Sequence, residues 1–160
     1  MWFRKSWLIG SNLTVAVLTI AVMLCATGAI AGVAEDLVEA ASSGDLHEVQ
    51  TMLAEGTDVN AAASGGYTAL MAASAKGHLV VVKELLAKGA DVNARKNDGS
   101  TALIAATMSG SLKVVRELIA KGANVNARSR SGETALTASY TGPKQHRDEI
   151  RVLLIKAGAK

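Results

Sequence analysis

The sequence predicts an all-α repeat solenoid of four two-helix repeats that follow an N-terminal leader. Two observations carry this prediction. Glycine, leucine and asparagine recur at a step of 33 residues through the second part of the chain, and charged residues are almost missing from residues 1–34. Internal periods of roughly 20–50 residues indicate stacked supersecondary units. We therefore expect residues 35–160 to form one repeat domain.

Residues 1–34 have the pattern of a signal peptide or a signal anchor. Two basic residues near the start are their only charges, and the uncharged run Ser6–Ala34 ends in small residues. A basic start, an apolar centre and an A-x-A ending indicate cleavage. We expect cleavage after Ala31 or, as a second choice, after Ala34. The uncharged run is also long enough for an uncleaved membrane anchor.

Both interpretations of the leader place the repeats on the far side of a membrane, because basic flanks stay in the cytoplasm. The chain is therefore predicted to be periplasmic or secreted. The alternative is a membrane-anchored chain with its repeats on the non-cytoplasmic side, which is the one case in which a membrane is a partner. Cys25, the only cysteine, lies in the leader, so the repeats need no disulfide in an oxidising compartment.

Each recurring residue has a structural task. Thr68, Thr101 and Thr134 each precede Ala-Leu and are placed to cap the first helix of a repeat. Gly77 and Gly110 permit a tight reversal into the second helix. That helix carries apolar residues at i, i+3, i+6 and i+7, namely Leu79, Val82, Leu85 and Leu86, then Leu112, Val115, Leu118 and Ile119. Asp-Val-Asn or Asn-Val-Asn segments then predict protruding hairpins.

Four repeats fit this step, at about residues 35–65, 66–98, 99–131 and 132–160. The ends of a solenoid need polar outer faces. The last repeat has roughly three additional residues between its helices, and it carries Arg151 where the middle repeats carry Val82 and Val115. Because Arg151 would disrupt an internal interface, we expect it on a solvent-facing end.

The pattern of helix, turn, helix and hairpin resembles the ankyrin repeat over residues 35–160. The segments Gly89–Ala94 and Gly122–Ala127 are nearly identical and match the family closely. The chain departs from the family motif Thr-Pro-Leu-His by having Ala69, Ala102 and Ala135 for the proline and Met71, Ile104 and Thr137 for the histidine. The resemblance implies an interaction module that binds another protein through its hairpin tips and the concave side of its first helices.

Applied to this sequence, that binding mode selects seven candidate partner-binding residues: Lys76, Arg95, Lys96, Asn97, Met108, Arg128 and Arg130. Ala72 and Ala138 are expected in the same shallow groove. Residues 35–66 carry seven acidic and no basic residues, whereas residues 67–160 carry fifteen basic and seven acidic ones. We expect a partner protein with an acidic patch; the alternative is that these charges only solvate the surface.

No catalytic site, metal site or cofactor is predicted. His47, His78 and His146 lie far apart in a linear stack and lack metal-ligand spacing. His78 is expected to serve the turn structurally. The acidic first repeat and the lack of aromatic stacking residues count against nucleic acid as a partner, and the net charge of +3 is too small to argue for it. A secreted effector with an unrecognised activity is the alternative from another functional class.

Overall fold

The structure is a computed structural model that describes residues 29–160. The chain divides into two compact units, Met1–Gly32 and Val33–Lys160. The second unit contains the repeats, whereas most of the predicted leader, with its anchor alternative and Cys25, lies outside the described residues. Within residues 29–160, no helix is both long and apolar enough to cross a bilayer.

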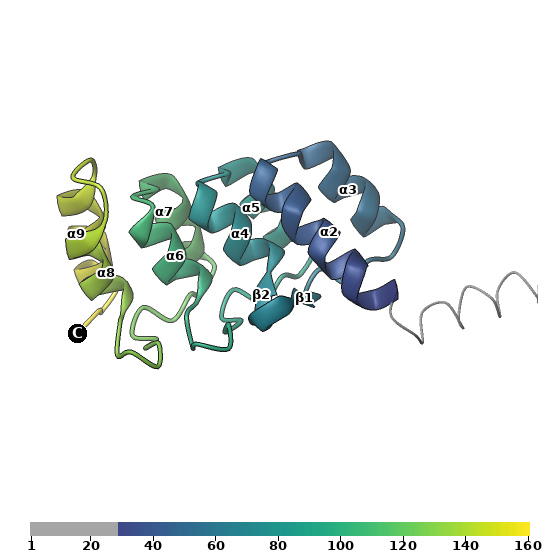
Figure 1. Ribbon diagram of the computed structural model, residues 1–160. Helices are drawn as coiled ribbons and strands as arrows, with labels where there is room; N and C mark the ends of the chain where they lie inside the picture. The colour runs from purple at the N-terminus through teal and green to yellow at the C-terminus, as the bar shows by residue number, and fades with distance from the viewer. Residues whose placement is uncertain (1–28) are drawn as a thin grey trace, which may run out of the picture. The chain divides into compact units, whose positions relative to one another are not determined.

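The described residues form four consecutive helix pairs, shown in chain order in Figure 1. The pairs are α2 (Ala29–Ser43) with α3 (Leu46–Ala54), α4 (Ala69–Lys76) with α5 (Leu79–Ala87), α6 (Ala102–Met108) with α7 (Leu112–Ala120), and α8 (Ala135–Thr141) with α9 (Arg147–Lys156). The predicted all-α repeat solenoid is confirmed. α2 begins before residue 34, so the predicted junction between leader and repeats falls inside a helix.

Loops join the pairs. The first loop contains a short antiparallel hairpin, β1 (Ala62–Ala63) and β2 (Tyr67–Thr68), with the 3-10 turn η1 (Ser64–Gly66) between the strands. In the described part of the chain, no other loop forms paired strands.

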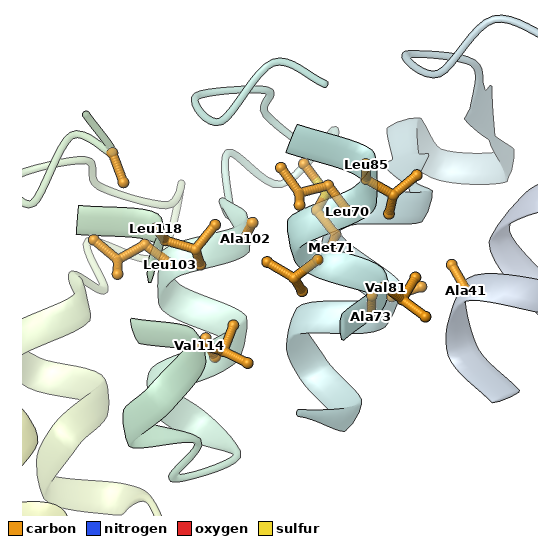
Figure 2. Close-up of a cluster of buried hydrophobic side chains, with 14 of the residues drawn as sticks. Ala41, Leu70, Met71, Ala73, Val81, Leu85, Ala102, Leu103, Val114 and Leu118 are labelled. Atoms are coloured by element: carbon orange, nitrogen blue, oxygen red, sulfur yellow. The ribbon is translucent and has the colours of Figure 1, made fainter. Parts of the chain in front are cut away.

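The helices form two layers. In one layer α4 packs on α6 and α6 on α8, and in the other α3, α5, α7 and α9 follow one another. The core between them consists of alanine, leucine and valine. Figure 2 shows Leu70 near Leu85 and Leu103 near Leu118, all at most 1% exposed. Small alanines such as Ala73, which is 0% exposed, let neighbouring helices approach closely.

The predicted capping residues are confirmed. The hydroxyls of Thr68, Thr101 and Thr134 each accept a hydrogen bond from the amide three residues later, at 3.4, 3.5 and 3.2 Å. Gly77 ends α4 in the left-handed region, with φ of 78°. These contacts satisfy amides and carbonyls that a helix end leaves free, so α4, α6 and α8 begin directly after the threonines that the sequence predicts as caps.

The structural role expected of His78 is confirmed. Its Nε2 atom lies 2.9 Å from the backbone oxygen of Ser42 in the preceding repeat. A Cβ placed on Gly44 would lie 2.7 Å from His78 Nδ1, so only glycine leaves room for the ring. His78 therefore braces two neighbouring turns.

The prediction for Arg151 in the last repeat and the prediction for the alanines of the groove have different outcomes. Arg151 is confirmed at the end of the stack, where its side chain is one-third exposed. In contrast, Ala72 and Ala138 are 1% and 0% exposed, so their placement in an open groove is wrong. Both alanines are in the cluster of buried residues that forms the hydrophobic core.

Candidate functional site

Three loops before α4, α6 and α8 contain most of the predicted binding residues. We call them finger 1 (residues 62–66), finger 2 (residues 95–99) and finger 3 (residues 128–132). Each ends in a glycine at the 33-residue step. Finger 1 is uncharged, finger 2 carries Arg95, Lys96 and Asp98, and finger 3 carries Arg128 and Arg130.

The fingers form a hydrogen-bonded row. The amide of Asn97 in finger 2 donates to the Gly65 oxygen of finger 1 at 2.8 Å. At the equivalent place, the amide of Arg130 donates to the Asp98 oxygen at 2.7 Å. The Arg95 guanidinium also donates to the backbone oxygen of Arg128. Because successive fingers are tied together, they are pre-organised for binding.

Fingers 2 and 3 are closed by different chemistry. In finger 2 Lys96 Nζ lies 3.0 Å from Asp98 Oδ2, whereas in finger 3 the hydroxyl oxygens of Ser129 and Ser131 are 2.8 Å apart. The Ser100 amide and the Lys96 ammonium lower the pKa of Asp98 to about 2. Asp98 is therefore ionised at neutral pH and offsets the charge of Lys96.

Lys96 has a second contact that holds it in place. Its ammonium lies 5.9 Å from the centroid of the Tyr67 ring. Partial burial raises the pKa of the Tyr67 phenol, and the nearby Lys96 charge opposes that rise. Tyr67 is thus neutral at physiological pH and serves as an aromatic face for the lysine.

Finger 3 carries the unbalanced charge. Arg128 and Arg130 are both exposed, and within residues 29–160 neither guanidinium forms an ion pair with an acidic side chain. Two unpaired guanidinium groups on one short loop suit a carboxylate or another planar anion. Of the two basic fingers predicted from sequence, finger 3 is therefore the stronger candidate for an anionic partner.

The two predicted residues on the first helices lie apart from the fingers. Lys76 ends α4 and Met108 ends α6, whereas the fingers precede the starts of these helices. An eight-residue helix is roughly 12 Å long, so these side chains do not join the finger cluster. Met108 is 49% exposed, which makes it a separate apolar contact point on the same layer.

A ladder of asparagines escaped the sequence analysis, which assigned these residues to turns only. Asn93 Oδ1 accepts from the Asn124 amide at 2.7 Å, and its Nδ2 donates to the Gly122 oxygen at 3.2 Å. Asn60 and Asn126 make the equivalent bonds to the loop that follows the next helix pair. The recurrence of asparagine at the 33-residue step was the signal of a contact between repeats.

No metal-binding cluster of three or more His, Cys, Asp or Glu side chains occurs within residues 29–160. The described surface therefore presents a rigid row of loops beside a layer of short helices. This arrangement defines a class of protein, the helical-repeat proteins. The family model for ankyrin repeats (3 copies) matches residues 37–129 and 93–160.

The chain belongs to the ankyrin-repeat family. Members of this family are generally protein–protein interaction modules and are typically not enzymes. Among curated proteins, none matches this chain.

Proposed function

We propose that this protein is an exported ankyrin-repeat module that binds an acidic surface of another protein, with finger 3 at the centre of the contact. The charge balance of the fingers supports the proposal best. Lys96 has Asp98 beside it, whereas Arg128 and Arg130 have no acidic partner among the described residues. Long-range attraction between such a basic loop and an acidic patch raises the rate of association.

The contacts within the row of fingers support different roles for finger 2 and finger 3. The Arg95 guanidinium donates to the backbone oxygen of Arg128, and the Lys96 ammonium pairs with Asp98. Because both cations of finger 2 already have partners within the protein, finger 2 mainly holds finger 3 in position. Asn97 contributes its amide to the same row. Lys76 and Met108 would then contact the part of the partner that lies along the first helices.

Charge reversal in finger 3 tests this proposal. The Arg128→Glu/Arg130→Glu variant is expected to associate with the captured partner at least about tenfold more slowly, and with a flatter salt dependence. Arg95→Glu/Lys96→Glu is expected to have a smaller effect. Partner capture from the periplasmic fraction, followed by association rates at several salt concentrations, gives the measurement.

A matched control separates local contact from overall charge. Lys83→Glu/Arg116→Glu reverses two exposed charges on α5 and α7 and changes the net charge by the same amount. This variant should keep the wild-type rate. Wild-type association by the finger 3 variant, or an equal loss in the control, would refute the assignment to finger 3.

The export part of the proposal is supported by the leader, and the start of α2 favours one of the two predicted cleavage sites. Ala34 is 3% exposed and belongs to the folded repeats. Cleavage after Ala31 leaves Ala34 in place, whereas cleavage after Ala34 removes it. We therefore favour a mature chain that begins at Gly32, with the membrane anchor as the alternative.

Fractionation and terminal sequencing test the export proposal. A chain cleaved after Ala31 contains no tryptophan, because Trp2 and Trp7 are the only two. Soluble periplasmic protein without indole fluorescence is the expected result. Protein that stays in the membrane fraction with its fluorescence supports the anchored scaffold, and protein that stays in the cytosol contradicts both.

A further inference from the structure

The last helix pair exposes side chains at positions that the earlier pairs bury. Tyr140 on α8 is 56% exposed, whereas Thr107 at the equivalent position of α6 is 1% exposed. Ile155 on α9 is 55% exposed, but its counterpart Ile119 packs against the core. Arg151 replaces Val115, which is fully buried. We call Tyr140, Arg151 and Ile155 the C-face.

The C-face has the chemistry of a contact surface for carboxylates. The Arg151 guanidinium lies 5.4 Å from the centroid of the Tyr140 ring, and its Nη2 lies 2.6 Å from Asp148 Oδ1. Asp148 is mostly exposed, so its pairing with Arg151 is weak and exchangeable. A guanidinium held over a ring beside an isoleucine suits an acidic group with apolar surroundings.

The first helix pair carries acidic residues at positions where the second pair carries buried apolar residues. Asp36 and Glu39 on α2 align with Ala69 and Ala72 of α4, which are 0% and 1% exposed. On α3, Glu48 aligns with Val81, which is 1% exposed. Asp36, Glu39 and Glu48 are themselves exposed, and we call these three acids the N-face.

The two faces are complementary in position and in charge. Each helix layer continues from one pair to the next, with α4 on α6 and α6 on α8, and α5 on α7 and α7 on α9. The positions of both faces are buried or partly buried in the inner pairs and more exposed at the two ends, so a neighbouring pair covers them. At the ends, an arginine replaces valine on one face and carboxylates replace alanine and valine on the other. Residues 35–66 carry seven acids and no basic residue, whereas residues 67–160 are strongly basic, so the two ends attract each other.

We propose that the C-face of one copy of this protein binds the N-face of a second copy, head to tail. This contact goes beyond the proposed function and uses none of the finger residues. It continues the repeat stack between chains, with Arg151 opposite Asp36, Glu39 and Glu48. A head-to-tail contact leaves one free face at each end of an open assembly, so the assembly grows with protein concentration, and it dissociates in high salt.

Two variants of the full chain, each with one blocked face, test the proposal. Tyr140→Glu/Ile155→Glu blocks the C-face, and Asp36→Lys/Glu39→Lys blocks the N-face. All four side chains are exposed, so both variants should keep the wild-type circular dichroism and melting curve. The average mass from light scattering is measured over a concentration series for the wild type, each variant alone and an equimolar mixture.

The expected pattern is specific to a head-to-tail contact. The wild-type mass rises with concentration, and each variant alone self-associates at least about tenfold more weakly, as expected for loss of a central contact. The mixture forms a one-to-one dimer that does not grow, because each chain keeps one open face. The control Lys83→Glu/Arg116→Glu assembles like the wild type.

Two results would overturn the proposal. One is a wild-type chain that stays monomeric up to its solubility limit. The other is a variant with a blocked N-face that still forms dimers alone, because this would indicate two C-faces in contact. Variants in finger 3 are expected to self-associate like the wild type, and variants in the C-face or N-face are expected to bind the partner protein like the wild type. Failure of the head-to-tail contact is therefore distinguishable from failure of the proposed function.

Discussion

The pair α6–α7 and the pair α8–α9 follow the same repeat pattern, but they differ in the residues at two equivalent positions and in how far those residues are buried. α6 and α7 bury Ile104 and Val115, at 1% and 0% exposure. α8 and α9 carry Thr137 and Arg151 at the same positions, and both are at least partly exposed. A repeat can therefore keep its fold while its outer side changes from an apolar interface into a polar surface.

The fingers before these two pairs differ in the same way. Finger 2 closes with an ion pair and finger 3 with two hydroxyls. The backbone geometry is shared, because the Lys96 amide donates to the Ser100 oxygen and the Ser129 amide donates to the Glu133 oxygen, both at 2.9 Å. The comparison shows that the stack sets the backbone and leaves the charge of each finger free to vary.

The largest expected effect concerns the core. Leu103→Ala in α6 removes a side chain that is 1% exposed and should lower the free energy of unfolding by about 2–5 kcal/mol. Leu136→Ala, at the equivalent position of α8, removes a partly exposed side chain and should cost about half as much or less. Urea unfolding followed by circular dichroism measures both. Equal losses would mean that α8 is as enclosed as α6.

A smaller effect is expected from the asparagine ladder. Asn93→Ala removes two hydrogen bonds that tie the loop after α5 to the loop after α7, and should cost about 1–2 kcal/mol. Asn126→Ala releases only the segment at Gly158 and Lys160 and should cost about 0.5–1 kcal/mol. The same unfolding experiment applies. A larger loss for Asn126 would contradict the ladder as a brace between repeats.

The smallest effect is expected from the contacts that close the fingers, the Lys96–Asp98 ion pair in finger 2 and the Ser129–Ser131 contact in finger 3, which should differ in their pH dependence. The folded-state pKa of Asp98 is lowered from 3.8 to about 2, so its stabilisation is present above pH 3.8 and is lost as the pH falls through about 2. Because Asp98 is exposed, Asp98→Asn should cost only about 0.5 kcal/mol at neutral pH. The difference in melting temperature from wild type should vanish near pH 2. Ser131→Ala in finger 3 should show no such pH dependence.

The repeat architecture could be predicted because its signals are local. Thr101 caps a helix through an amide three residues away, and Gly77 reverses the chain at its own position. Such contacts need no knowledge of the rest of the chain. The buried side of the second helices was predicted in part. Val82 and Leu85 are enclosed as predicted, but Val81 is equally buried and was not predicted. Figure 2 shows Val81 beside Ala41 of α2, in the preceding repeat.

The candidate site was predicted less completely. Arg95, Lys96, Arg128 and Arg130 were selected together because all four are basic residues at the tips of the two predicted hairpins. Only the structure shows Arg95 bound to a backbone oxygen and Lys96 next to Asp98 and Tyr67. Lys76 and Met108 were predicted on the concave side of the first helices below the fingers, and the structure places them at the ends of α4 and α6 that lie away from the fingers.

By itself, the sequence determined the 33-residue step, the caps, the turns and the acidic and basic halves of the repeat domain. These follow from residue type and short spacing, which act within one repeat. The tertiary structure decided which charges are neutralised, which alanines are enclosed and which faces stay exposed. Those properties depend on contacts between residues about 30 positions apart, such as Asn93 with Asn124, and stacking alone brings such residues together.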